Sequence, residues 1–166
     1  TFSDLCSFKG IGPARAIDIL TFLELGRRYS AASPTDKDVI CSSDDAFTHF
    51  YPILADLDHE EMWILLLDKR NNVIGKEQLS GGGRSSTIVD VSLAMKKAII
   101  ASASSCIIAH NHPSGNTVPS QQDKQITTSF CEAGKLLNIP LRDHLIIGRG
   151  GFKLKNYYSF HDNDCL

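Results

Sequence analysis

The sequence predicts an α/β domain in which helices pack on a mixed sheet, preceded by a small helical segment at the N-terminus. Short apolar runs typical of buried strands alternate along the chain with stretches whose apolar residues recur every three or four positions, as in amphipathic helices. Clusters of glycine, proline and asparagine separate these stretches. With 166 residues, 42% of them hydrophobic, the chain can bury a sizeable core.

The N-terminal part begins with a glycine-rich turn at residues 9–12, followed by a helix from residue 13 to about residue 28, because proline suits the first helical position. We expect residues 1–30 to form this segment, residues 31–42 a linker, and residues 43–166 the main domain. The elements predicted in the main domain are a helix at 44–57, strands at 62–68, 73–79 and 86–89, a helix at 91–102, a strand at 106–110, a helix after Ser120, and strands at 144–148 and 152–157.

His110 and His112, at the end of a predicted strand, form the most informative motif. Side chains alternate between the two faces of a strand, so both imidazoles point to one side and can reach one ion. Pro113 and Gly115 then turn the chain, and Asp123 can return as a third ligand from the next element. Three protein ligands with an open fourth position are typical of a catalytic zinc site. The sequence therefore predicts one Zn²⁺ per chain, bound by His110, His112 and Asp123.

Ser120 and Asp123 also have a second interpretation. The pair precedes a helix-like run, and a serine followed three residues later by an acid resembles a capping box. Taken alone, the pair favours a helix cap over a metal ligand. The two roles are compatible, however, since a residue in the first helical turn points back toward the end of the preceding strand.

The run from His110 to Gly115, His-Asn-His-Pro-Ser-Gly, followed by Ser120 and Asp123, resembles the signature of the JAMM (MPN+) metalloproteases and is similar to their bacterial RadC-like branch. Residues 143–148 resemble RadC sequence downstream of this motif. Residues 9–28 resemble the end of the helix-hairpin-helix module that precedes the RadC domain. The resemblance implies a cytidine-deaminase-like (JAB/MPN) α/β fold, with a partial helix-hairpin-helix segment at residues 1–30 and a metalloprotease domain at residues 43–166.

The resemblance also implies a glutamate base upstream of the metal motif, and Glu60 and Glu61 are both candidates. Strand alternation lets only one of them face the metal. The distance to the Leu-Asp pair that ends the strand favours Glu60, whereas an aromatic residue two positions later favours Glu61, which is followed by Trp63. We assign the base to Glu60, because Met62, two residues after it, commonly replaces phenylalanine in a core.

The chemistry implied by these residues is hydrolysis of a peptide or isopeptide amide. Zinc lowers the pKa of its bound water to roughly 7. Glu60 would take a proton from this water and deliver it to the leaving amine, and Ser120 would donate a hydrogen bond to the oxyanion or orient the water. His144 could support the metal site or contact the substrate; a partly buried strand histidine without such a role is the alternative.

Three other metal-dependent classes do not match. The His-Asn-His letters coincide with the name of a nuclease class whose motif is spread over a much longer segment. A zinc deaminase would need a Pro-Cys-x-x-Cys segment, and a thermolysin-like protease would need His-Glu-x-x-His on a helix. The sequence contains neither.

The N-terminal turn predicts a second, weaker site. Gly10 and Gly12 stand before a helix start, where backbone N–H groups can bind DNA phosphates, and Lys9 and Arg15 could reinforce this contact. Against this role, residues 1–30 carry four basic and three acidic side chains, and one hairpin would bind DNA weakly and without sequence specificity. A packing role for this segment is an equal alternative.

Composition narrows the surroundings in which the protein acts. The net charge of −2 offers no general attraction to nucleic acid or to an anionic membrane. No apolar run approaches the roughly 20 residues of a membrane span, and no signal-peptide pattern is present. The five cysteines are odd in number and scattered, as is typical of reduced thiols, so we expect a cytoplasmic protein without a membrane partner. The pattern does not predict an oligomeric state.

Two classes of function follow from these features. The first is a zinc-dependent amide hydrolase built on the residues named above. The second is a RadC-type protein of DNA repair or recombination, either DNA-binding or a metal-dependent nuclease. The chemistry favours the first class, because the sequence shows no second metal site that could clamp a phosphodiester.

Overall fold

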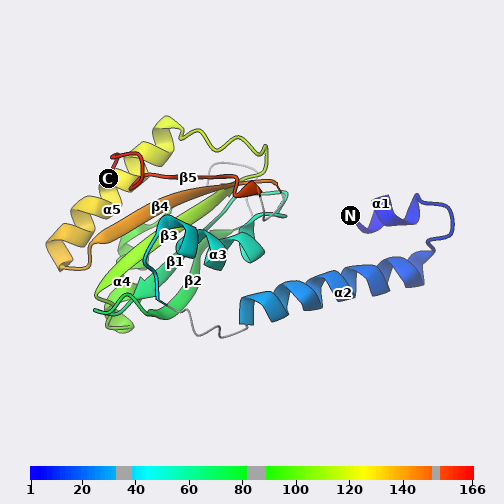
Figure 1. The fold of residues 1–166 in the computed structure, drawn as a ribbon, viewed down its shortest axis with the longest axis horizontal. Coiled ribbons are helices and arrows are strands. Elements are labelled where there is room, and N and C mark those ends of the chain that lie inside the picture. Colours follow the sequence, from blue (N-terminus) through cyan, green and yellow to red (C-terminus); the bar gives the residue numbers. More distant parts are fainter. Residues whose placement is uncertain (33–38, 82–88, 151–153) are drawn as a thin grey trace. The chain divides into compact units, whose positions relative to one another are not determined.

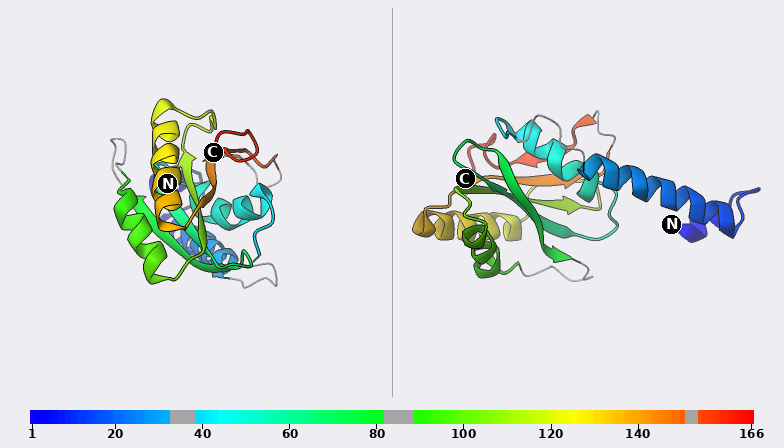
Figure 2. Two further views of the ribbon diagram at one scale, coloured as in Figure 1. Left: turned by 90° about the vertical axis from the view of Figure 1, so that its left-hand side faces the viewer. Right: turned by 90° about the horizontal axis from the view of Figure 1, so that it is seen from below.

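The computed structural model describes residues 1–32, 39–81, 89–150 and 154–166. The chain divides into two compact units, Thr1–Pro34 and Thr35–Leu166. The second unit is a five-stranded sheet with helices on both faces (Figure 1, Figure 2). The predicted fold class, an α/β domain with a mixed sheet after a short helical segment, is therefore confirmed.

The first unit consists of α1 (Phe2–Cys6) and α2 (Pro13–Ala32). Gly10 has a φ of 90°, in the left-handed region that glycine adopts without strain, and it turns the chain between the two helices. Helix α2 continues past the predicted end near residue 28, so residues 31 and 32 of the predicted linker are helical. Alanine has the highest helix propensity and occupies both positions.

The sheet of the second unit has the order β2-β1-β3-β4-β5. Its strands are β1 (Glu61–Leu67), β2 (Val73–Gly81), β3 (Ser105–His112), β4 (Leu141–Gly148) and β5 (Tyr157–Ser159). The central strand β3 pairs antiparallel with β1 and parallel with β4, and the outer pairs are antiparallel, which makes the sheet mixed.

Each face of the sheet is covered by helices. Helix α3 (Ser43–Leu54) lies on one face, and α4 (Val91–Ile100) and α5 (Gln121–Leu137) lie on the other (Figure 2). Ile107 and Ala109 of β3 pack in the core cluster that contains the α3 residues. The alternate β3 residues, Cys106 and Ile108, pack in the cluster that contains α4 and α5 residues. Residues 110 and 112 continue this second series, so their side chains belong to the α5 face.

Helix α5 is held firmly at both ends. Ser120 forms its N-cap and Asn138 its C-cap, the latter with a left-handed φ of 56°. Gly134 lets the last turns lie against the chain that leads into β4, because a Cβ there would come within 2.5 Å of the Ile139 carbonyl oxygen. The first turn of α5 is thereby placed beside the end of β3.

The bounds of several predicted elements differ from the structure; for example, α3 ends at Leu54 and β4 begins at Leu141, each three residues before the predicted position. The predicted strand at 86–89 lies almost entirely outside the described residues. Residues 152 and 153 of the last predicted strand lie outside the described residues, and β5 begins only at Tyr157, because Lys155 has a left-handed φ of 46° that interrupts an extended chain. Val39 bridges Asn72 and Ile40 is buried in the α3 cluster, so these two residues of the predicted linker pack with the second unit.

No helix in the described parts of the chain is both long and apolar enough to span a membrane.

Candidate metal centre

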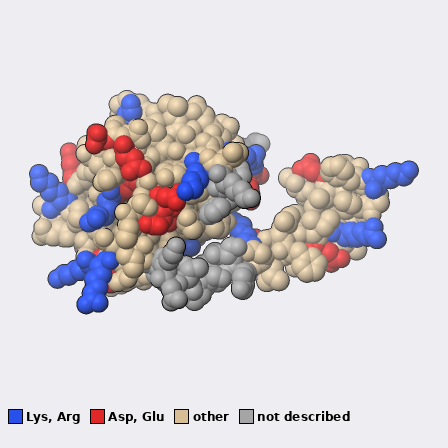
Figure 3. Space-filling view, viewed as in Figure 1, with Lys and Arg blue, Asp and Glu red and all other residues tan. Residues whose placement is uncertain are grey.

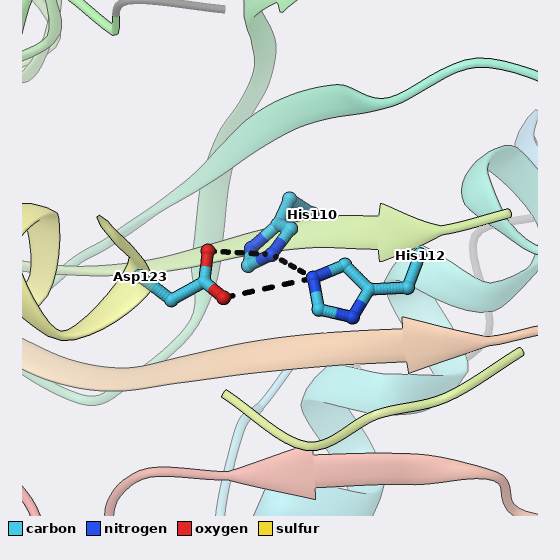
Figure 4. A group of neighbouring side chains, drawn as sticks. All are labelled: His110, His112 and Asp123. Atoms are coloured by element: carbon cyan, nitrogen blue, oxygen red, sulfur yellow. Dashed lines mark hydrogen bonds and ion pairs between the residues drawn. The ribbon is translucent and has the colours of Figure 1, made fainter. Parts of the chain in front are cut away.

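Three predicted ligands meet where the end of β3 faces the first turn of α5 (Figure 4). His110 Nε2 lies 3.0 Å from His112 Nε2 and 3.1 Å from Asp123 Oδ1. His112 Nε2 lies 3.6 Å from Asp123 Oδ2. All three potential ligand atoms lie within 4.8 Å of one another, so one ion could contact all of them. Strand alternation and the helix start therefore bring together the residues that the sequence singled out.

Asp123 acts as a helix cap and faces the histidines at the same time. Its Oδ2 accepts a hydrogen bond from the Ser120 backbone N–H at 2.7 Å, and the Ser120 hydroxyl oxygen accepts one from the Asp123 N–H at 3.1 Å. Its Oδ1 faces His110. Burial raises the pKa of this carboxyl, but hydrogen bonds from His110, His112 and Ser120 outweigh burial and hold that pKa well below its ordinary value. The carboxylate is thus ionised and ready to bind a cation.

The His112 ring is oriented by the loop that connects β3 to α5, residues 113–120, which we call the metal loop. Its Nδ1 lies 2.6 Å from the Asn116 carbonyl oxygen. A carbonyl only accepts hydrogen bonds, so Nδ1 carries a proton, and the neutral form of the ring would present the lone pair of Nε2 to a cation between His110 and Asp123. In the absence of a cation, the hydrogen bond to Asp123 is the main cause that raises the pKa of His112.

The His110 ring is oriented by a buried chain of hydrogen bonds through His144. Thr127 donates its hydroxyl proton to the backbone carbonyl oxygen of Asp123 at 2.6 Å. Because a hydroxyl has one proton, the Thr127 oxygen must accept the hydrogen bond from His144 Nδ1, which lies 2.7 Å away. Burial holds the pKa of His144 well below its ordinary value, so this ring is neutral and its Nε2 lacks a proton. His144 Nε2 therefore accepts from His110 Nδ1 at 2.9 Å. His110 Nε2 is thereby left as the nitrogen that faces Asp123 and His112.

The donor set fits a metal ion. Two imidazole lone pairs only 3.0 Å apart repel each other unless a cation lies between them, and a carboxylate completes the group. Zinc–nitrogen distances of about 2.0–2.1 Å in tetrahedral geometry place two nitrogens roughly 3.3 Å apart, close to this separation. His144 lies outside the set, because both of its nitrogens are used by His110 and Thr127. It supports the His110 ring from behind.

The two candidate glutamates lie on opposite faces. Glu60 immediately precedes β1, and continued alternation from Met62, which pairs with His110 and packs on the α5 side, would place its side chain on that side. It is exposed, and its charge contributes to the raised pKa of His112. Glu61 instead accepts a hydrogen bond from Trp63 Nε1 at 2.9 Å, and its other oxygen lies 3.0 Å from His59 Nε2. The charge of Glu60 thus acts on one of the three candidate ligands.

His144 was the one residue around the ligands that the sequence indicated; two others, Thr127 and Asn156, were not predicted. Thr127 follows Asp123 by one helical turn, a spacing that could have suggested contact along one helix face. Asn156 ties the metal loop to the end of β4, since its Nδ2 donates to the carbonyl oxygens of Gly115 and Arg149. Gly148 makes room for it, because a Cβ there would lie 2.3 Å from Asn156 Nδ2. No local pattern indicated this contact between distant segments.

The residues considered for DNA binding lie in the first unit. Arg15 donates to the Gly10 carbonyl oxygen at 3.0 Å, across the turn that contains Lys9 and Gly12. Arg27 and Arg28 of α2 both pair with Glu24. Three of the four basic side chains of this segment are therefore engaged within it, which lowers the free positive charge that it could offer to phosphates.

We predict that Thr127→Val lowers zinc affinity by about 10- to 100-fold. Without the hydroxyl, His144 can move its proton to Nε2 and force His110 to carry a proton on the nitrogen that should bind the metal. Thr128→Val is the matched control, because the exposed Thr128 hydroxyl makes the same kind of bond, to the Lys124 carbonyl. Competition with a chelating dye measures both. Equal affinities in the two variants would show that the buried hydrogen bonds through His144 do not determine which nitrogen of His110 carries the proton.

Comparison with known proteins identifies the family of this chain. A family model described as the RadC-like JAB domain matches residues 40–165. A UPF0758 protein of Flavobacterium johnsoniae is 49% identical over 160 residues, which are 96% of this chain and 68% of that protein. UPF0758 proteins of Porphyromonas gingivalis and Rubrobacter xylanophilus are 44% identical over 160 residues and 40% identical over 154 residues; these matches span 96% and 93% of this chain and 69% and 68% of those proteins. The chain therefore belongs to the RadC-like JAB domain family.

Proposed function

We propose that the protein is a zinc-dependent hydrolase of peptide or isopeptide amide bonds, with its centre at His110, His112 and Asp123. The observation that carries the proposal is the pair of imidazoles whose Nε2 atoms are directed, by hydrogen bonds on their Nδ1 atoms, toward one ionised carboxylate. Zinc in this position would polarise the scissile carbonyl and make water a nucleophile at neutral pH.

Glu60 supplies the proton transfers in this scheme. It is exposed, so a substrate can reach it, and it lies within electrostatic range of His112. Its carboxylate accepts a proton from the attacking water and returns it to the nitrogen of the leaving amine as the carbon–nitrogen bond breaks. A group that serves first as base and then as acid needs contact with both solvent and substrate. Glu60 is exposed and lies just before the first residue of β1, so both can reach it.

Ser120 stabilises the negative charge that develops on the carbonyl oxygen. Its oxygen already accepts the Asp123 N–H, so its orientation is fixed by the helix cap. In the absence of a cation the Ser120 hydroxyl also interacts with the Asp123 carboxylate, and in this proposal it turns its proton toward the oxyanion once that carboxylate binds the metal ion. The helix cap thereby places a donor next to the proposed metal ligands.

A second candidate is the DNA-associated function implied by the RadC resemblance. It is supported by membership in the RadC-like family and by the glycine turn before α2, whose backbone N–H groups could contact phosphates. Two observations weigh against it. Basic and acidic side chains are interspersed on the face of the molecule shown in Figure 3. Within the described residues, one cluster of three potential metal ligands is present, whereas phosphodiester cleavage commonly uses two ions.

We predict that the purified protein binds about one zinc per chain and that His112→Ala loses it. His161→Ala is the control, because His161 is an exposed histidine outside the cluster and its removal should leave zinc content unchanged. Elemental analysis after gel filtration in a zinc-buffered solution measures the ratio of metal to protein. Equal zinc in wild type and His112→Ala would exclude this site.

We predict that Glu60→Gln keeps its zinc but loses about 10²–10⁴-fold in hydrolysis of fluorescein-labelled casein, because glutamine cannot accept the proton. Glu61→Gln should stay near wild type, since its side-chain oxygen can still accept from Trp63 on the opposite face. Nicking of supercoiled plasmid, measured with the same samples, separates the two candidate functions. Plasmid nicking without casein hydrolysis, or full casein activity in Glu60→Gln, would overturn the amide-hydrolase proposal.

A further inference from the structure

Asn111 lies between the two histidines in sequence but points to the other face of β3. It is 2% exposed, so its amide must find partners inside the protein. Its Nδ2 donates to the His59 carbonyl oxygen at 2.8 Å, and its Oδ1 accepts from the Glu61 backbone N–H at 2.8 Å. One side chain thus bonds to two main-chain groups that are 50 residues or more away in sequence.

These two main-chain groups belong to the peptide units on either side of Glu60. The pairing of β1 with β3 ends at Met62 opposite His110, so Glu60 lies beyond the last paired residue of the ladder. Peptide units are planar, and holding the unit before and the unit after a residue fixes both of its backbone dihedral angles. The Asn111 amide therefore sets the direction in which the Glu60 side chain leaves the main chain.

The neighbouring side chains strengthen this arrangement. Glu61 accepts from Trp63 Nε1 and lies 3.0 Å from His59 Nε2, which holds both residues that flank Glu60. His59 also lies 2.9 Å from Asp58 through its Nδ1. The exposed Glu60 is thus carried by a backbone segment that is anchored on both sides.

We propose that Asn111 is a positioning residue that holds Glu60 at a constant place relative to the histidines on either side of Asn111. The proposal rests on the proposed function, in which Glu60 transfers protons at the metal centre. Because Asn111 belongs to the same three-residue stretch of β3 as both histidines, any movement of this strand end carries the metal ligands and the base together. A purely apolar residue would fill the same space without linking the two segments.

The first test is independent of activity and of metal. In metal-free protein, Asn111→Ala should speed hydrogen exchange of the Glu61 amide by about tenfold, because this amide loses its acceptor. Ile107→Ala is the matched control, since Ile107 lies on the same strand and the same face but makes no bond to residues 59–61. It should lower the melting temperature without selective exchange at Glu61. Unchanged exchange at Glu61 in Asn111→Ala would show that Asn111 does not hold this segment.

The second test asks whether the two hydrogen bonds of Asn111 affect catalysis through Glu60. With zinc content equal to wild type, Asn111→Ala should hydrolyse labelled casein about 10²-fold more slowly, as expected when a catalytic group is misplaced by about 1 Å. The double variant with Glu60→Gln should be no slower than Glu60→Gln alone, because both changes remove the same contribution. Additive losses, or wild-type turnover in Asn111→Ala, would contradict the proposal.

Asn111→Asp provides a second variant if alanine prevents folding. It is nearly the same size and keeps the acceptor for the Glu61 amide, but it replaces the donor to the His59 carbonyl with an oxygen. Exchange at Glu61 should stay slow while casein hydrolysis falls, and wild-type hydrolysis would overturn the proposal. If the wild-type protein itself hydrolyses no casein, the proposed function fails, whereas amide exchange still decides whether Asn111 holds this segment.

Discussion

The site depends on strict alternation along β3, the central strand of the sheet. Even-numbered residues point toward α5: first Cys106 and Ile108, which are buried in the core, and then the two histidines. Because the same face carries the core and the ligands, burial of the first pair determines where the second pair points. A shift of one residue in the pairing of β3 would turn both histidines toward α3 and place Asn111 where a ligand should be. The directions of the two histidines in the candidate metal centre are therefore fixed by packing of the hydrophobic core.

A small set of hydrogen bonds turns this placement into a prepared site. Each histidine uses Nδ1 for a partner behind it, the Asn116 carbonyl for His112 and neutral His144 for His110, so that both Nε2 atoms face forward. Asp123 uses one oxygen to cap α5 and directs the other toward His110. The helix cap and the metal site are therefore not competing interpretations of the same residues. They are one arrangement, in which the start of α5 is stabilised by the carboxylate that we propose as a metal ligand.

The sequence predicted what depends on local periodicity and missed what depends on strand order. The closeness of the histidine pair to Asp123 follows from a period of two and a helix start, whereas the choice of Glu60 as the base stays a prediction made by counting along one strand. The roles of Thr127 and Asn111 could not be found in this way. The role of Thr127 requires that β4 lie parallel beside β3, so that His144 can contact the His110 ring. The role of Asn111 requires that β1 be the neighbour of β3 on its other side. Neither neighbour is encoded in a short sequence pattern.

The central claim is that the fold presets the protonation of three neighbouring histidines so that two of them can bind a metal. Long-range proton–nitrogen correlation spectra of isotope-labelled, zinc-loaded protein measure which ring nitrogen carries the proton. The account predicts a proton on Nδ1 and none on Nε2 for His110, His112 and His144, and it predicts that Thr127→Val disturbs this pattern at His110 and His144. A proton on Nε2 of either His110 or His112 in the zinc-loaded protein would contradict the account.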